Sequence, residues 1–207
     1  MRSLQVEAGL LKLSCQYPEP EAFREAVASS TRNSHESVVR FLLTEGIPFA
    51  FRDRPALFEA LRAWLGEYLT VCPKEITLIG SARIGFSLAS PPDYGRAFNE
   101  NSDLDLSVVS LSLFEKFYDS FAQWKADYTA GIVQPRNERE RQHWDDNIHL
   151  VPKHLSKGFV DANKVPNLIR YPIAQSVSQA MWLLGRKLEI TEGAPKVRKS
   201  SIRIYNS

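Results

Sequence analysis

Residues 76–110 read ITLIGSARIGFSLASPPDYGRAFNENSDLDLSVVS, and this stretch decides the expected fold. Its first four residues are apolar or β-branched and predict a short buried strand, which Gly80 and Ser81 end in a turn. Leucine and valine return after residue 103 and predict a second strand, on which Asp103 and Asp105 stand two positions apart. Side chains two residues apart on a strand project from the same face. The stretch therefore predicts two neighbouring carboxylates on a strand that follows a Gly-Ser turn.

This pair of carboxylates indicates a bound cation. Like charges on one strand face repel unless a cation, an arginine or water lies between them. Mg²⁺ commonly takes one or two carboxylates together with substrate phosphates, and the backbone N–H groups of a turn can face an anion. We therefore expect Asp103 and Asp105 to hold Mg²⁺ or Mn²⁺, and Gly80 and Ser81 to face a phosphate. A pair of aspartates in an exposed strand or turn, with no metal, is the alternative.

The same residues carry a family resemblance. Gly80-Ser81, followed by Ser102-Asp103-Leu104-Asp105-Leu106, resembles the GS…D-x-D signature of the nucleotidyltransferase superfamily related to DNA polymerase β. The resemblance covers residues 57–110. It implies that the Gly-Ser turn holds a triphosphate, that the two aspartates bind the catalytic metals, and that a third carboxylate on a later strand completes the site. The residues GSARIGFS also resemble small bacterial nucleotidyltransferase-like proteins, some of which look like parts of defence or toxin–antitoxin systems.

The position of the third carboxylate stays open. Asp161, in the run GFVDAN, is the best candidate because a short apolar segment precedes it and a loop follows, although a turn or helix-cap role fits the same pattern. Asp119 and Asp127 lie off the apolar stripe of a helix predicted over residues 111–130, so we expect them to be solvated. The last predicted strand, residues 197–205, contains no acid.

Two arginines are candidates for contact with phosphate. Arg83 follows Ser81 closely and either reaches a nucleotide phosphate or neutralises one of the two strand aspartates. Arg96 belongs to the polar, breaker-rich loop of residues 90–101. This loop either covers a substrate, with its aromatic rings stacked on a base and Arg96 on phosphate, or is an ordinary exposed insertion.

Length and composition predict one domain, with or without a helical appendage. The chain has 207 residues, 43% of them hydrophobic, which is enough for a full core. We expect a helical segment over residues 1–56 that packs on the core, and a nucleotidyltransferase-like domain over residues 57–207. No apolar run approaches the length of a membrane span or a signal peptide, so we expect a cytoplasmic protein with no membrane partner. Amphipathic patterns predict helices over residues 22–29, 34–44, 55–69, 111–130 and 173–188.

The charge balance gives no overall electrostatic argument for nucleic-acid binding. Lys and Arg number 26 and Asp and Glu number 24, for a net charge of +2. A local argument rests on the basic strand predicted over residues 197–205, whose polar face could follow a phosphate backbone. The same residues would also protect an edge strand from aggregation. The two cysteines, Cys15 and Cys72, match no metal or redox spacing.

We therefore expect an α+β domain of the polymerase β nucleotidyltransferase type, with a small mixed sheet flanked by several helices. The leading function is transfer of a nucleoside monophosphate from a nucleoside triphosphate such as ATP to an unknown acceptor, which could be RNA, a protein or a small molecule. The alternative is a catalytically degenerate nucleotide-binding module, or one that binds a protein partner as antitoxin, sensor or scaffold. Loss of the third acid would favour this alternative.

Overall fold

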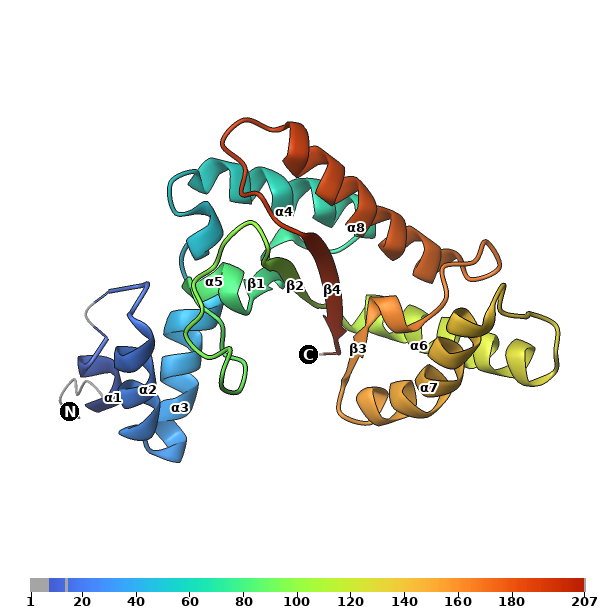
Figure 1. Ribbon diagram of the computed structural model, residues 1–207, viewed down its shortest axis with the longest axis horizontal. Coiled ribbons are helices and arrows are strands. Elements are labelled where there is room, and N and C mark those ends of the chain that lie inside the picture. Colours follow the sequence, from blue (N-terminus) through green and yellow to red (C-terminus); the bar gives the residue numbers. More distant parts are fainter. Residues whose placement is uncertain (1–7, 14, 207) are drawn as a thin grey trace.

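A four-stranded mixed sheet lies at the centre of the protein, whose computed structural model describes residues 8–13 and 15–206 (Figure 1). The strands are β1 (Ile76–Ile79), β2 (Asp103–Val109), β3 (Phe159–Asp161) and β4 (Lys199–Tyr205), in the spatial order β1-β2-β4-β3. Strand β2 is antiparallel to β1 and parallel to β4, and β3 is antiparallel to β4. This small mixed sheet among helices confirms the predicted α+β class.

The sheet has one apolar face and one polar face. Alternate residues of the strands are almost fully buried and share a core with helices α4 (Pro55–Leu69), α6 (Leu111–Thr129) and α8 (Pro172–Ile190). In Figure 1, α4 and α8 lie together on one side of the sheet. The strand residues that alternate with these buried ones point to the opposite side of the sheet, which we call the polar face. Directly paired residues on neighbouring strands point to the same side of a sheet. The pairing places on this face Thr77, Asp103, Asp105, Ser107, Asp161, Lys199, Ser201 and Arg203.

Strand β4 is an interior strand. It pairs with β2 on one side and with β3 on the other, so the edge-protection interpretation of the basic strand is wrong. The predicted division of its side chains is confirmed, since Ile202 and Ile204 are buried in the core. The basic residues of β4 therefore lie in the middle of the polar face.

Helices α6 and α7 (Glu138–Leu155) form the end of the molecule beyond β3 (Figure 1). The predicted aromatic stripe of α6 is confirmed as core, and Trp124 meets Trp144 of α7 edge to face with the ring centroids 5.8 Å apart. The short 3-10 helix η4 (Ala162–Lys164) follows β3, and η3 (Pro73–Glu75) precedes β1. Within the described residues, no helix combines the length and the apolar character needed to cross a membrane.

Asp127 of α6 is buried, so the expectation that it would be solvated is wrong. Its carboxylate accepts hydrogen bonds from Arg170 Nε at 2.6 Å, from the Tyr171 hydroxyl at 3.0 Å and from Gln123 Nε2 at 3.0 Å. The hydrogen bond from Arg170 lowers the pKa of Asp127, while burial and the Asp127 carboxylate raise the pKa of Tyr171 to about 12. These contacts join α6 to the segment that leads into α8.

The N-terminal elements have a small core of their own. They are α1 (Ala8–Leu11), α2 (Pro20–Ala28), α3 (Arg32–Val39) and the π-helical turn η1 (Arg40–Thr44). Leu13, Ala26, Val38 and Leu42 form this core, which is separate from the main one. The 3-10 helix η2 (Phe49–Phe51) then leads to α4. Figure 1 shows these helices at the end of the molecule opposite α6 and α7.

Candidate functional site

A pocket of about 330 Å³ opens where the turn after β1 meets the start of β2. Its lining comes from that turn, from the loop between α5 (Ser81–Ile84) and β2, and from Arg198 just before β4. The structure thus brings together most of the residues that the sequence singled out, namely Gly80, Ser81, Arg96, Ser102, Asp103 and Asp105.

Gly80 lies beside the carboxylate of Asp105. Its backbone has φ +66° and ψ −152°, a conformation that essentially only glycine adopts. A Cβ atom built there would lie 3.5 Å from Asp105 Oδ2. The missing side chain therefore leaves space between the turn and this carboxylate oxygen, while Ser81 starts α5 on the pocket wall.

Asp103 is neutralised by Arg198, which sequence reasoning did not place in the site. Arg198 Nε lies 3.0 Å from Oδ1 and its second guanidinium nitrogen lies 3.2 Å from Oδ2, a two-point contact. Lys199 Nζ approaches Oδ2 at 3.5 Å. The hydrogen bond to Asp103 raises the pKa of Arg198. The backbone N–H of Arg198 donates to the Ser102 carbonyl at 2.9 Å, which fixes this residue at the pocket rim.

Asp105 has a hydroxyl neighbour on the adjacent strand. The Ser201 hydroxyl donates to Asp105 Oδ1 at 2.6 Å, and the two residues are directly paired between β2 and β4. Strand β4 is thus the later strand beside the two aspartates, and it carries a serine at the level of Asp105. No group of three His, Cys, Asp or Glu side chains suited to a metal ion occurs among the described residues.

Asp161 lies on the polar face but away from the pocket. It is paired with Arg203 of β4, which is paired with Ser107 of β2, so two strand spacings and two residues separate Asp161 from Asp105. Standard sheet dimensions put their Cα atoms about 12 Å apart. Asp161 instead accepts from Arg203 Nε at 2.6 Å and lies 3.5 Å from His154 Nδ1. This geometry does not bring Asp161 to the first two aspartates as a third metal ligand.

Arg83 departs from both of its expected roles. Its side chain is buried, with 1% of the residue exposed, and its guanidinium donates to the backbone carbonyls of Leu42 at 2.9 Å, of Gly46 at 3.0 Å and of Glu45. Burial lowers its pKa. Arg83 therefore attaches the N-terminal helices to α5 and contacts neither the aspartates nor the pocket.

The loop before β2 is fixed by contacts of its own. The Tyr94 hydroxyl donates to the Pro20 carbonyl at 2.8 Å, so this ring packs on the start of α2 and does not offer a face to the pocket. The Ser102 hydroxyl accepts from the Asn99 N–H at 3.1 Å and shapes the end of the loop. Arg96 lines the pocket with an exposed side chain, 3.9 Å from Asp93.

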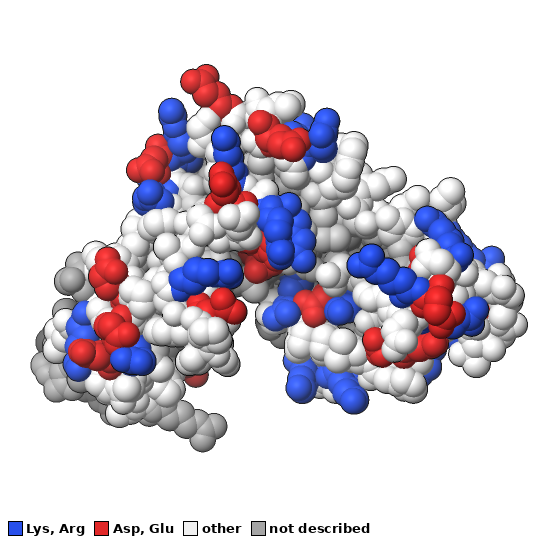
Figure 2. All heavy atoms as spheres, viewed as in Figure 1, with Lys and Arg blue, Asp and Glu red and all other residues white. Residues whose placement is uncertain are grey.

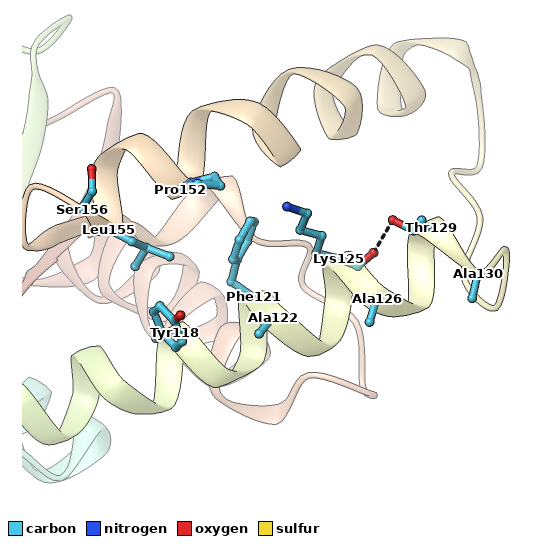
Figure 3. Close-up of a pocket in the computed structure, with 10 residues that line it drawn as sticks. All are labelled: Tyr118, Phe121, Ala122, Lys125, Ala126, Thr129, Ala130, Pro152, Leu155 and Ser156. Atoms are coloured by element: carbon cyan, nitrogen blue, oxygen red, sulfur yellow. Dashed lines mark hydrogen bonds between the residues drawn. The ribbon is translucent and has the colours of Figure 1, made fainter.

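A larger groove of about 810 Å³ separates α6 from α7. Figure 3 shows Phe121, Pro152 and Leu155 lining it, with Lys125 extending from α6 toward α7. Lys125 is the one charged side chain among its lining residues, so this groove lacks the paired groups that acid–base or metal chemistry needs. Of these two cavities, the smaller one is the one lined by carboxylates.

Comparisons of the chain with protein-family models, curated proteins and solved structures found no match.

Proposed function

We propose that this protein is a metal-dependent nucleotidyltransferase of the polymerase β type, which binds a nucleoside triphosphate in the pocket between Gly80 and the two β2 aspartates. The observation that carries the proposal is the juxtaposition of Asp105 Oδ2 with the bare backbone of Gly80, with Asp103 beside it. A carboxylate next to an open turn is suited to a phosphate only if a cation lies between the two negative groups. The pocket therefore favours a phosphate bound together with a metal.

The donor set fits Mg²⁺ or Mn²⁺. Both ions prefer oxygen ligands, and a magnesium site usually combines one or two carboxylates with substrate phosphates. When bound, such an ion neutralises the charge of the phosphates. Asp103 and Asp105 would hold it through their carboxylates, while Gly80 leaves room for the phosphate.

In this proposal Arg198 binds the triphosphate as well as Asp103. In the structure it covers both oxygens of Asp103. A guanidinium binds carboxylate and phosphate with the same two-point geometry, so Arg198 can exchange Asp103 for a triphosphate oxygen without leaving the pocket rim. It then stabilises the charge that develops on the phosphates during transfer.

The transfer forms a bond between an acceptor hydroxyl oxygen and the α-phosphorus, and it breaks the bond from that phosphorus to the oxygen that bridges it to the β-phosphate. Pyrophosphate leaves with the bridging oxygen. The acceptor proton passes to water, because the residue paired with Asp105 on β4 is Ser201, a hydroxyl and not an acid. Positioning and electrostatic stabilisation supply most of the catalysis.

The serine at position 201 also favours a second candidate function, that of a module which binds a nucleotide but does not catalyse nucleotidyl transfer. A hydroxyl binds Mg²⁺ less strongly than a carboxylate and cannot act as a base at neutral pH. In that case the pocket would report the presence of a nucleotide to a protein partner.

Pyrophosphate release distinguishes the two candidates. Wild type would be incubated with each nucleoside triphosphate, Mg²⁺ or Mn²⁺, and RNA, protein or small-molecule acceptors, with Asp103→Asn/Asp105→Asn as the test variant. Asp119→Asn/Asp146→Asn, which changes two exposed aspartates elsewhere, is the matched control. Release that the control retains and the test variant loses supports transfer. Metal-dependent nucleotide binding without release supports the second candidate, and neither activity contradicts both.

A further inference from the structure

A second group of charges lies at the opposite end of the polar face, around Asp161. Arg203 Nε donates to Asp161 Oδ1 at 2.6 Å, and His154 Nδ1 lies 3.5 Å from Oδ2. Lys157 lies in the turn between α7 and β3, and Lys164 ends η4 directly after β3, so the two lysines flank the strand that carries Asp161. We call His154, Lys157, Lys164 and Arg203 the basic cluster.

The basic cluster carries more positive charge than its own carboxylate can balance. Burial lowers the pKa of His154, so this imidazole is neutral at pH 7. Arg203, Lys157 and Lys164 then contribute three positive charges against the single negative charge of Asp161, a local excess of two. An excess of this kind on one patch of a nearly balanced protein indicates an anionic partner.

Arg203 is held in position for such a partner. Its guanidinium carbon lies 5.0 Å from the centre of the Phe159 ring, and that ring stacks on His154 with centroids 4.6 Å apart. The Arg203 side chain is nevertheless 41% exposed. A guanidinium has five N–H donors, so Arg203 has further donors besides those that face Asp161 and Tyr205.

The basic cluster and the nucleotide pocket share a continuous surface. Lys199, Ser201 and Arg203 follow one another on the polar side of β4, and Ser201 stands beside Asp105. Sheet geometry places the Cα atoms of Arg203 and Asp105 about 8 Å apart. In Figure 2 the surface is hollowed between the N-terminal helices and α7, and blue and red side chains meet at the edge of this hollow beside the sheet.

We propose that the basic cluster binds the phosphates of a single-stranded nucleic acid, whose end reaches Asp103 and Asp105 as the acceptor of the transferred nucleotide. The acceptor role rests on the proposed function, whereas strand binding itself does not. Lys199 and Arg203 on β4, with Lys157 and Lys164 beyond it, suit a nucleic-acid strand, which carries one negative charge on each nucleotide.

Fluorescence anisotropy of labelled oligonucleotides tests this proposal without nucleotide or turnover. RNA and DNA strands of about ten nucleotides, a length within the usual range for single-strand sites, form the two arms. The test variant is Lys157→Gln/Lys164→Gln. The matched control is Lys116→Gln/Lys125→Gln, which removes two exposed lysines from α6. Thermal melting verifies that each variant is folded.

We expect wild type and control to bind with equal affinity and the test variant to bind about a hundredfold more weakly, at roughly tenfold for each of the two lost charge-assisted hydrogen bonds. The slope of log affinity against log salt should fall by about 1.4 in the test variant, at about 0.7 per lost phosphate contact on a single strand. Preference for the RNA or the DNA arm identifies the acceptor. Arg203→Lys, which keeps the charge and loses the two-point geometry, should also weaken binding.

Equal affinity of the test variant and the control would overturn the proposal, as would equally tight binding of polyglutamate, which carries charge without phosphates. Failure here is distinguishable from failure of the proposed function. If metal-dependent nucleotide binding is present and the oligonucleotides do not bind, only the acceptor assignment is wrong. If oligonucleotides bind at the basic cluster but nucleotides do not bind at Asp103 and Asp105, the cluster stands as a binding site and the transferase proposal fails.

Discussion

Replacing Arg198 with alanine should change metal affinity and nucleotide affinity in opposite directions. Without Arg198, both oxygens of Asp103 become available to a cation. The Arg198 side chain is 63% exposed and that of Asp103 is 25% exposed, so solvent screens this ion pair and it competes only weakly with a cation. Such weak competition predicts that Mn²⁺ alone binds up to about fivefold more tightly to Arg198→Ala.

Nucleotide affinity should fall in the same variant. With the metal saturating, the triphosphate loses a charge-assisted contact worth about 1.5 to 3 kcal/mol, which corresponds to a loss of about 10- to 150-fold. Isothermal titration with Mn²⁺ alone, and then with nucleoside triphosphate at saturating Mn²⁺, measures both effects. Arg186→Ala is the matched control, because the Arg186 side chain is as exposed as that of Arg198 and also pairs with a carboxylate, Glu189, on α8. If both affinities fall together, or if neither changes, the exchange role of Arg198 is refuted.

Three more predictions concern other parts of the structure. Gly80→Ala should lower the free energy of unfolding by about 1 to 2 kcal/mol, because φ at this position is +66°, and it should also abolish nucleotide binding. Denaturant melts measure the first effect and nucleotide titration measures the second. Unchanged nucleotide affinity would contradict a phosphate-binding turn at Gly80. Ser201→Asp should lower the melting temperature without metal, because it adds a like charge beside Asp105. Addition of Mn²⁺ should raise the melting temperature of this variant. A melting temperature that does not change with Mn²⁺ would argue against a metal at this position. Asp127 has a lowered pKa in the folded protein, so its contribution to stability is present above pH 3.8 and is lost as pH falls further. Melts at a series of pH values should therefore show that Asp127→Asn loses less stability than wild type below about pH 4, where unfolded aspartates become protonated.

The parts of the site that sequence reasoning found are those set by local pattern. The apolar run before Gly80, the turn and the alternation around Asp103 and Asp105 are each defined within a few residues, and the structure brings them to one pocket. The helix over residues 111–130 was predictable for the same reason, since its aromatic stripe repeats at helical spacing.

The parts that were missed depend on contacts between distant segments. Arg198 reaches Asp103 across 95 residues, and only the parallel pairing of β4 with β2 brings them together. Arg83 is buried because the N-terminal helices lie over it. Asp127 lies on the buried face of α6, three residues after Trp124, and the segment before α8 supplies Arg170 as its partner in the interior. Local periodicity contains no information on such pairings.

Thermal melting tests the central claim most directly. Wild type, Asp103→Asn/Asp105→Asn and the control Asp119→Asn/Asp146→Asn would be melted with Mg²⁺ or Mn²⁺, with and without each nucleoside triphosphate. A ligand at about a hundred times its dissociation constant adds about 2.7 kcal/mol, or roughly 5 to 11 °C for a chain of this length. We predict this shift in wild type and in the control, only when metal and nucleotide are both present, and its loss in the double Asp103/Asp105 variant. A folded wild type with no shift, or an equal shift in the double variant, would contradict a nucleotide site at Asp103 and Asp105.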